Sequence, residues 1–187
     1  SEAVGLKNRP RFVSRVGVFS FYIKDRKVDL EVVMRHDLRP GDRLFTVSAF
    51  LITKDEPRPR ALLINHPKLG KWLQPGGHVE RGQDPIMALI EECEVEVGID
   101  IESYLRPLAN FGNVDVLPLP VHLTSILIPA GKPNPGDPEH YMIDLAYLIR
   151  LPHQPVKEGI EAVWVDKIHL ALYDMPADVR FFLKHHL

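Results

Sequence analysis

The 187-residue chain contains a single cysteine, Cys93, and its formal net charge is only −2. One cysteine excludes an intramolecular disulfide and favours a reducing compartment, so we expect a cytoplasmic protein. No hydrophobic run approaches the length of a membrane span, and the first residues lack the pattern of a signal peptide. The small charge argues against nucleic-acid binding through a broad positive field, but it is compatible with small phosphorylated ligands. Nothing in the sequence indicates the oligomeric state.

The composition, with 45% hydrophobic and 26% charged residues, is that of an ordinary globular protein. The turn "LRPGDR" at 38–43 predicts an N-terminal extension, residues 1–43, and a main domain, residues 44–187. We expect the extension to pack on the domain, because it is rich in Phe and Val yet too short for an easy core of its own. Within it, residues 16–23 alternate weakly like a strand, and residues 29–36 are spaced for a helix.

The main domain alternates β-branched, apolar runs with turns rich in proline and glycine. These runs predict strands at 44–53, 61–66, 105–112, 121–128, 141–151 and 162–165. Helices are expected at 85–97, 166–173 and 176–187. Many strands and few helices predict a mixed sheet in an α+β or α/β layer fold.

The helix at 85–97 has clear start and stop signals. Asp84 is a capping residue, Pro85 occupies the first helical position, and Gly98 is a C-terminal stop. Side chains at three- and four-residue steps form one apolar face: Ile86, Leu89, Ile90, Cys93 and Val97. Cys93 on this face reads as a buried thiol and not as a nucleophile.

Glu92 and Glu96 are four residues apart and therefore lie one above the other beside the apolar face. Like charges at this spacing destabilise a helix, and a cation between them would remove that cost. Two carboxylates suit a hard ion such as Mg²⁺, and Gly76 and Gly77 let the backbone approach and offer a carbonyl oxygen. The alternative interpretation of the acidic residues is a solvated helix face.

The stretch from Gly77 to Ile99 resembles a Nudix box, whose pattern is Gly, five residues, Glu, seven residues, Arg-Glu-aliphatic-x-Glu-Glu-x-Gly-aliphatic. Cys93 takes the first aliphatic place, and four further residues fall at the right offsets after Gly77: Glu92, Glu96, Gly98 and Ile99. The departures are Gln83 for the first Glu, Glu91 for Arg, and Val95 for the first of the paired Glu residues. The order of elements extends the resemblance over about residues 44–165.

Flanking segments resemble one branch of the family. "WLQPGGHVERG" at 72–82 is similar to that branch's Trp-Leu-Gln-Pro-Gly-Gly-His-x-Glu. The branch also carries Glu-His-x-His-x-Asp; here "EHYMID" keeps His140 and Asp144, while Met142 replaces the second histidine. The resemblance makes His78 and His140 candidate substrate-binding residues. The alternatives are a loop histidine bonded to backbone for His78, and a locally satisfied edge-strand pair for His140 with Asp144.

The resemblance implies a mixed sheet sandwiched between helices and the hydrolysis of a pyrophosphate bond in a nucleoside diphosphate derivative or nucleotide. It implies Mg²⁺ or Mn²⁺ as cofactor, with Glu92 and Glu96 as catalytic metal ligands and the Gly77 carbonyl as a further ligand. Gln83 and Val95 each remove a carboxylate that the family pattern has, which weakens metal binding. A Nudix-fold protein that binds a nucleotide-like ligand without cleaving it, as a sensor or adaptor, is therefore the alternative function.

Overall fold

The computed structural model describes residues 17–23, 26–32, 38–55 and 57–187. The chain forms two compact units, Ser1–Leu38 and Arg39–Leu187. The second unit begins close to the expected start of the main domain, and the packing of residues 1–43 on that domain stays a prediction. No helix among the described residues is long and apolar enough to cross a membrane.

In the first unit, strands β1 (Gly17–Ile23) and β2 (Arg26–Val32) form an antiparallel pair with Gly17 opposite Val32. The strand expected at 16–23 is confirmed over β1. The helix expected at 29–36 is wrong where β2 covers it, and residues 33–36 lie outside the described residues. Residues 29–32 also alternate in polarity, and pairing with β1 selects the two-residue period of a strand over the helical one.

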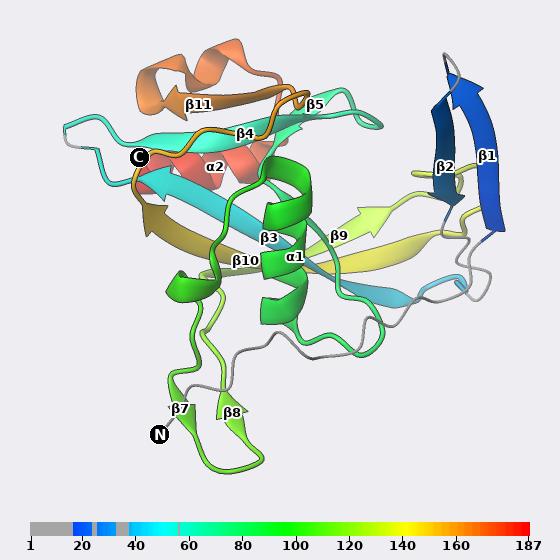
Figure 1. The fold of residues 1–187 in the computed structure, drawn as a ribbon, viewed down its shortest axis with the longest axis horizontal. Coiled ribbons are helices and arrows are strands. Elements are labelled where there is room, and N and C mark those ends of the chain that lie inside the picture. Colours follow the sequence, from blue (N-terminus) through cyan, green and yellow to red (C-terminus); the bar gives the residue numbers. More distant parts are fainter. Residues whose placement is uncertain (1–16, 24–25, 33–37, 56) are drawn as a thin grey trace. The chain divides into compact units, whose positions relative to one another are not determined.

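The second unit is built on a mixed sheet with the strand order β11-β4-β3-β10-β9 (Figure 1). β3 runs parallel to β10, and the other neighbouring strands are antiparallel. Two short strands attach to this sheet, β5 to β4 and β6 to β3. The bounds are β3 Arg43–Thr53, β4 Arg60–His66, β5 Lys71–Leu73, β6 Gly76–His78, β9 His122–Ile128, β10 His140–Leu151 and β11 Ala162–Asp166.

The remaining elements correct two expectations. Residues 105–112 are not a continuous strand; only β7 (Ala109–Asn110) pairs, with β8 (Asp115–Val116), after the 3₁₀ turn η2 (Glu102–Tyr104). Pro107 has no N–H for a ladder, and Leu105 is buried in the core whereas Leu108 and Phe111 are exposed, so the run does not lie on one face of the sheet. Residues 167–172 form a 3₁₀ helix, η3 (Lys167–Leu172), and not an α-helix.

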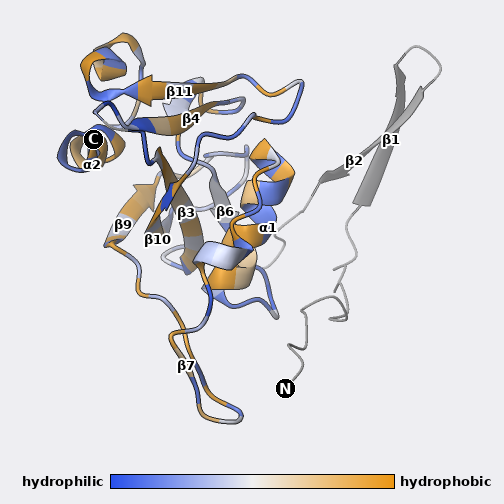
Figure 2. Cartoon of the chain, turned by 60° about the vertical axis from the view of Figure 1, so that its left-hand side comes forward, coloured by the Kyte–Doolittle hydropathy of each residue, from blue (hydrophilic) through white to orange (hydrophobic). Residues whose placement is uncertain are grey.

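Two helices cover opposite faces of the sheet, α1 (Pro85–Val97) and α2 (Ala177–His186) (Figure 1). Alternate residues of β3 separate two cores: Val47, Ala49 and Leu51 pack with α1, whereas Phe50 and Ile52 pack with α2. Because both faces are covered, residues 46–53 are all buried, including the polar side chains of Thr46, Ser48 and Thr53. Figure 2 shows a hydrophobic and a hydrophilic side on each helix. The expected mixed sheet between helices is confirmed.

Candidate active site

Helix α1 begins and ends at the residues that the sequence predicts. Asp84 Oδ1 accepts hydrogen bonds from the backbone N–H groups of Ile86 and Met87, at 2.9 Å each. At the other end Gly98 has φ 73°, and its N–H bonds to the Glu94 carbonyl at 3.1 Å. The left-handed conformation at Gly98 favours glycine, because any side chain there is strained. The two caps fix where the acidic side chains of α1 stand relative to the sheet.

The segment Gly76–His78 is strand β6, so His78 is not a loop histidine, and the strand pairs with Thr46–Ser48 of β3. A β-carbon at Gly77 would lie 2.0 Å from Glu92 Oε1, so the carboxylate of Glu92 fills the space that any side chain at position 77 needs. Glu96 Oε2 accepts a hydrogen bond from the Gly76 N–H at 3.0 Å. The diglycine and the two helical carboxylates therefore form one packed unit.

The strand pairing also determines whether the Gly77 carbonyl already accepts a hydrogen bond. Ala49 N–H bonds to the Pro75 carbonyl and Val79 N–H to the Phe45 carbonyl, at 2.8 and 2.9 Å. In an antiparallel ladder the bonded pairs recur every second residue, so Val47 opposite Gly77 is also a bonded pair. The Gly77 carbonyl, a candidate metal ligand, thus has a ladder partner, and one lone pair is left for a cation.

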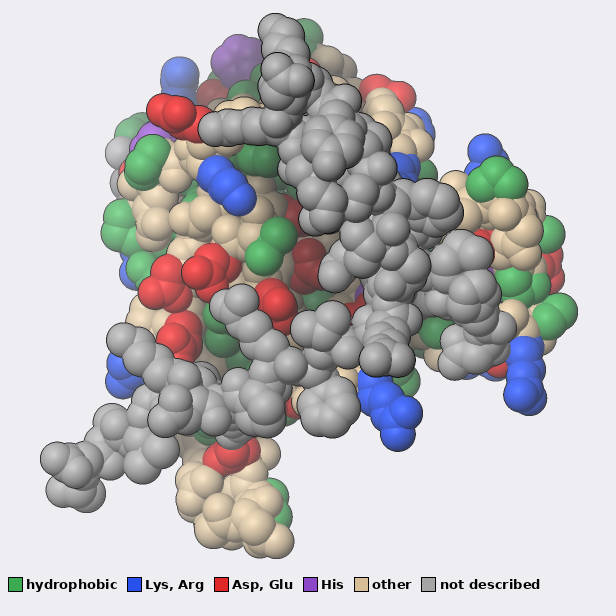
Figure 3. Space-filling view, turned by 45° about the vertical axis from the view of Figure 1, so that its right-hand side comes forward, with side chains coloured by type: hydrophobic (Ala, Val, Ile, Leu, Met, Phe, Trp, Pro, Cys, Tyr) green, Lys and Arg blue, Asp and Glu red, His purple; other side chains and the backbone are tan. Residues whose placement is uncertain are grey.

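Burial raises the free energy of ionising the carboxyl groups of Glu92 and Glu96. Desolvation, followed by the charges of Glu96, Glu91 and Glu80, raises the pKa of Glu92 from 4.5 to about 7. Desolvation also raises the pKa of Glu96, and the bond from the Gly76 N–H partly opposes that rise. Figure 3 shows acidic side chains gathered on the face that carries α1. An unneutralised acidic pair of this kind is stabilised by any bound cation.

Two of the three departures from the family pattern form one contact that the sequence did not reveal. Gln83 Nε2 donates to Glu91 Oε2 at 2.7 Å, and Gln83 Oε1 accepts from the Glu80 N–H at 2.9 Å. Where the pattern has Glu and Arg, this chain has an amide facing a carboxylate. A glutamate at 83 would place like charges at that distance, so the two departures compensate each other. In the sequence, this contact is indicated by the fact that positions 83 and 91 both depart from the family pattern.

The donor set fits a hard divalent ion. Glu92 and Glu96 offer carboxylate oxygens beside β6, and the Gly77 carbonyl keeps one lone pair next to its bond to β3. Among the described residues, no group of three or more His, Cys, Asp or Glu side chains is placed to hold a metal. Mg²⁺ commonly binds through one or two carboxylates and keeps waters and substrate phosphates as its other ligands. Val95, the third departure, is 58% exposed and offers no oxygen from its side chain.

The two candidate histidines lie in different environments. His78 is half-buried in β6 opposite Thr46. His140 is 1% exposed, and its Nδ1 donates to the Pro138 carbonyl at 2.7 Å. The ring of His140 therefore lies beneath the surface, and a substrate would reach it only after local opening. Roles of His78 and His140 in substrate binding stay predictions.

The expectation that His140 and Asp144 form an edge-strand pair is wrong. Strand β10 lies between β3 and β9, and the two side chains have separate partners. Asp144 accepts hydrogen bonds from Thr46 Oγ1 at 2.8 Å and Ser48 Oγ at 2.7 Å. Desolvation raises the pKa of Asp144, while both hydroxyls lower it. In the sequence, a partner for a polar group was indicated by Thr46 and Ser48, two polar residues inside a predicted buried strand.

Cys93 is fully buried on the inner face of α1, which confirms the interpretation of a buried thiol. Burial raises the pKa of its thiol, with smaller contributions from Glu96 and Glu92. A thiol kept protonated and out of contact with solvent is a poor nucleophile. Cys93 therefore does not supply a nucleophile to this site.

The NUDIX domain model matches residues 42–180, which is most of the chain. The chain belongs to the Nudix family. No curated protein sequence matches it. Among solved structures, a NUDIX-family hydrolase from Clostridium perfringens is 24% identical, with a TM-score of 0.57 over 77% of this chain and 95% of that one.

Two further solved structures have similar folds. The NUDIX domain of Shewanella oneidensis NrtR, complexed with ADP ribose, is 14% identical, with a TM-score of 0.50 over 78% of this chain and 87% of that one. The C. elegans Ap4A hydrolase is 17% identical, with a TM-score of 0.50 over 76% and 95%. At these identities the likeness establishes the fold alone, and the chemistry must be argued from this chain's own residues.

Proposed function

We propose that the protein is a hydrolase that cleaves a pyrophosphate bond in a nucleoside diphosphate derivative or a nucleotide, with Mg²⁺ or Mn²⁺ as cofactor. The observation that carries the proposal is the packed unit of Glu92 against Gly77 and Glu96 on the Gly76 N–H. A chain with Cys93 as its one cysteine suits a reducing compartment, and we propose the cytoplasm.

The chain's own residues position the reaction. The bond from the Gly76 N–H fixes the orientation of the Glu96 carboxylate, and the absence of a side chain at Gly77 admits that of Glu92. Both carboxylates are partly removed from water, which strengthens their attraction for a cation. A divalent ion bound there would neutralise charge on the diphosphate and lower the pKa of a bound water.

The test is a turnover assay with nucleoside diphosphate derivatives and nucleoside triphosphates, in Mn²⁺, in Mg²⁺ and in a chelator. We expect turnover of at least one substrate with metal and none with chelator. Glu92→Gln and Glu96→Gln should each lower kcat by about a hundredfold or more, as the loss of a group that stabilises transition-state charge does. Glu94→Gln on the exposed side of α1 is the matched control. Absence of turnover on the whole panel would refute the proposal.

A second candidate function is a binding protein for a nucleotide-like ligand. The observation that favours it is the amide–carboxylate contact between Gln83 and Glu91, which stands where the family pattern places a glutamate and an arginine. The NrtR domain complexed with ADP ribose is an example of a Nudix fold holding such a molecule. This function predicts ligand binding without turnover, and ligand affinity that is unchanged in Glu92→Gln.

A further inference from the structure

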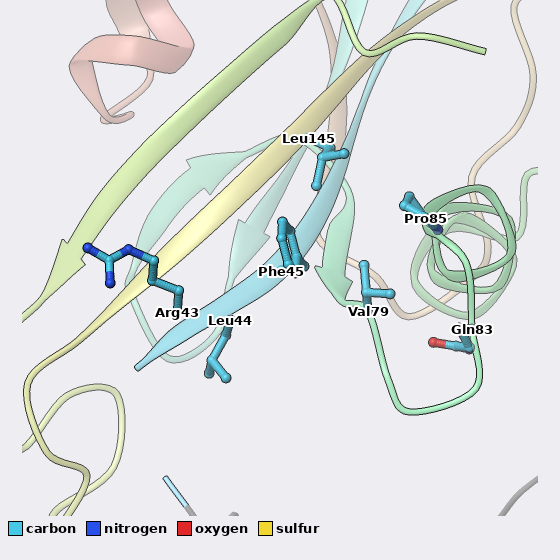
Figure 4. A pocket seen from close by; sticks show the side chains of 7 residues that line it. All are labelled: Arg43, Leu44, Phe45, Val79, Gln83, Pro85 and Leu145. Atoms are coloured by element: carbon cyan, nitrogen blue, oxygen red, sulfur yellow. The ribbon is translucent and has the colours of Figure 1, made fainter. Parts of the chain in front are cut away.

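A cavity of about 470 Å³ opens beside the start of α1, on the same face of the sheet. We call it the Phe45 pocket; its lining residues are Arg43, Leu44, Phe45, Val79, Gln83, Pro85 and Leu145. Figure 4 shows Phe45 and Leu145 of the sheet facing Val79 and Pro85 across the cavity, while Arg43 extends away toward the open side. The volume lies within the usual range for small-molecule sites.

The described residues that line the Phe45 pocket are mostly apolar, and none of them is acidic. Phe45 is 56% exposed although it lies on a strand whose following residues are buried. The one amide in the wall, Gln83, is held by Glu91 and by the Glu80 N–H. The cationic residue, Arg43, has its guanidinium 5.1 Å from the centre of the Tyr141 ring. Such a pocket favours a flat, apolar ligand group with polar edges, and an exposed ring supplies a stacking surface.

The pocket is close to the carboxylates. Phe45 and Val47 are two residues apart on β3, so they share a face and are separated by about 7 Å along the strand. Val47 lies opposite Gly77, and Gly77 is the residue against which Glu92 packs. A nucleotide is long enough to place its base on Phe45 and its phosphates near Glu92.

We propose that the Phe45 pocket binds the nucleobase of the substrate by stacking on Phe45, and that the base, more than the group beyond the diphosphate, determines which compounds bind. This inference rests on the proposed function for the position of the phosphates. Stacking of a base on an aromatic side chain contributes about 1–3 kcal/mol and tolerates different bases. The pocket therefore discriminates compounds with a base from those without one.

The test compares ligands that differ only in the base. Nucleoside 5′-monophosphates with each of the four bases and ribose 5-phosphate are titrated calorimetrically into the full chain in Mg²⁺. None of these probes contains a pyrophosphate bond, so binding is measured independently of turnover. We expect at least one monophosphate to bind about 5- to 150-fold more tightly than ribose 5-phosphate, which is the ratio that stacking provides.

Phe45→Ala should bring this ratio close to one, and Phe45→Trp should keep it, because tryptophan restores the stacking surface. The matched control is Phe181→Ala: Phe181, on α2, is also 56% exposed and should leave the ratio unchanged. The inference is overturned if Phe45→Ala keeps the wild-type ratio, or if no monophosphate binds the wild type better than ribose 5-phosphate. Failure of the turnover panel alone would refute the hydrolase and leave this ratio intact.

Discussion

Replacing Glu92 by glutamine should stabilise the metal-free protein at high pH and leave its stability unchanged at low pH. The folded state raises the pKa of Glu92 to about 7, whereas in the unfolded chain the carboxyl ionises at its ordinary pKa of 4.5. Between these values the folded state holds a proton that the unfolded state releases, so stability falls as pH rises from 4.5 to 7. Above pH 7 the folded protein carries the full cost of the buried charge. Glutamine has nearly the same shape and never carries that charge.

The cost for a fully buried group would be roughly 3 kcal/mol, at 1.36 kcal/mol for each pH unit between the two pKa values. Glu92 is only half-buried, and solvent screens part of its interactions, so we expect about 1–2 kcal/mol. For a domain of this size, 1–2 kcal/mol corresponds to a rise of roughly 2–8 °C in Tm at pH 8. At pH 5, just above the unfolded-state pKa, the rise should be about a quarter as large.

The assay is urea denaturation at pH 5 and pH 8 in the presence of a chelator, followed by the fluorescence of Trp72 and Trp164. Both tryptophans pack against the cores, so their emission reports loss of the fold. Glu94→Gln, an exposed change on the same helix, should shift the midpoint equally little at both pH values. If Glu92→Gln were destabilising at pH 8, or stabilising by the same amount at pH 5, the reasoning from burial and like charge would be wrong.

Three further changes test the local geometry. Gln83→Glu should lower the free energy of unfolding by about 1 kcal/mol, because it replaces the bond to Glu91 by two like charges. Adding Glu91→Arg should restore the wild-type value. Chemical denaturation of the single and double variants measures both effects. Gly77→Ala should weaken Mn²⁺ binding in a calorimetric titration, because its β-carbon would displace the carboxylate of Glu92; unchanged affinity would contradict the packed unit. Asp84→Ala should lower the free energy of unfolding by about 0.5–2 kcal/mol through loss of the N-cap, and a change below 0.3 kcal/mol would mean that Asp84 does not hold the helix start.

Helix α1 could be predicted to the residue because its signals are local. Asp84, Pro85 and Gly98 act on backbone groups within one turn of themselves, and no distant partner is needed. The long strands could also be predicted, because a short β-branched run that is buried on both faces favours a strand over a helix. Residues 105–112 differ: their composition suited a strand, but among the described residues only β8 pairs with any part of them.

The site itself depends on contacts between distant residues, and these were not visible. Strand β6 contains two glycines, which have low strand propensity, and it exists because β3 offers Thr46–Ser48 as a partner. Asp144 lies almost a hundred residues from Thr46 and Ser48 in sequence, and only the parallel pairing of β10 with β3 brings them together. The spacing of Glu92 and Glu96 was readable, but their contacts with Gly77 and Gly76 were not.

The departures from the family pattern affect the surroundings of the site more than its centre. Gln83 and Glu91 change together and keep a direct contact, and Val95 points toward solvent. Glu92 and Glu96, by contrast, remain partly buried beside each other at a cost to folding. A protein that only stacked a base on Phe45 would gain stability by losing one of these charges, whereas a bound cation would offset their repulsion. The retained acidic pair therefore favours the metal-dependent hydrolase over the binding protein.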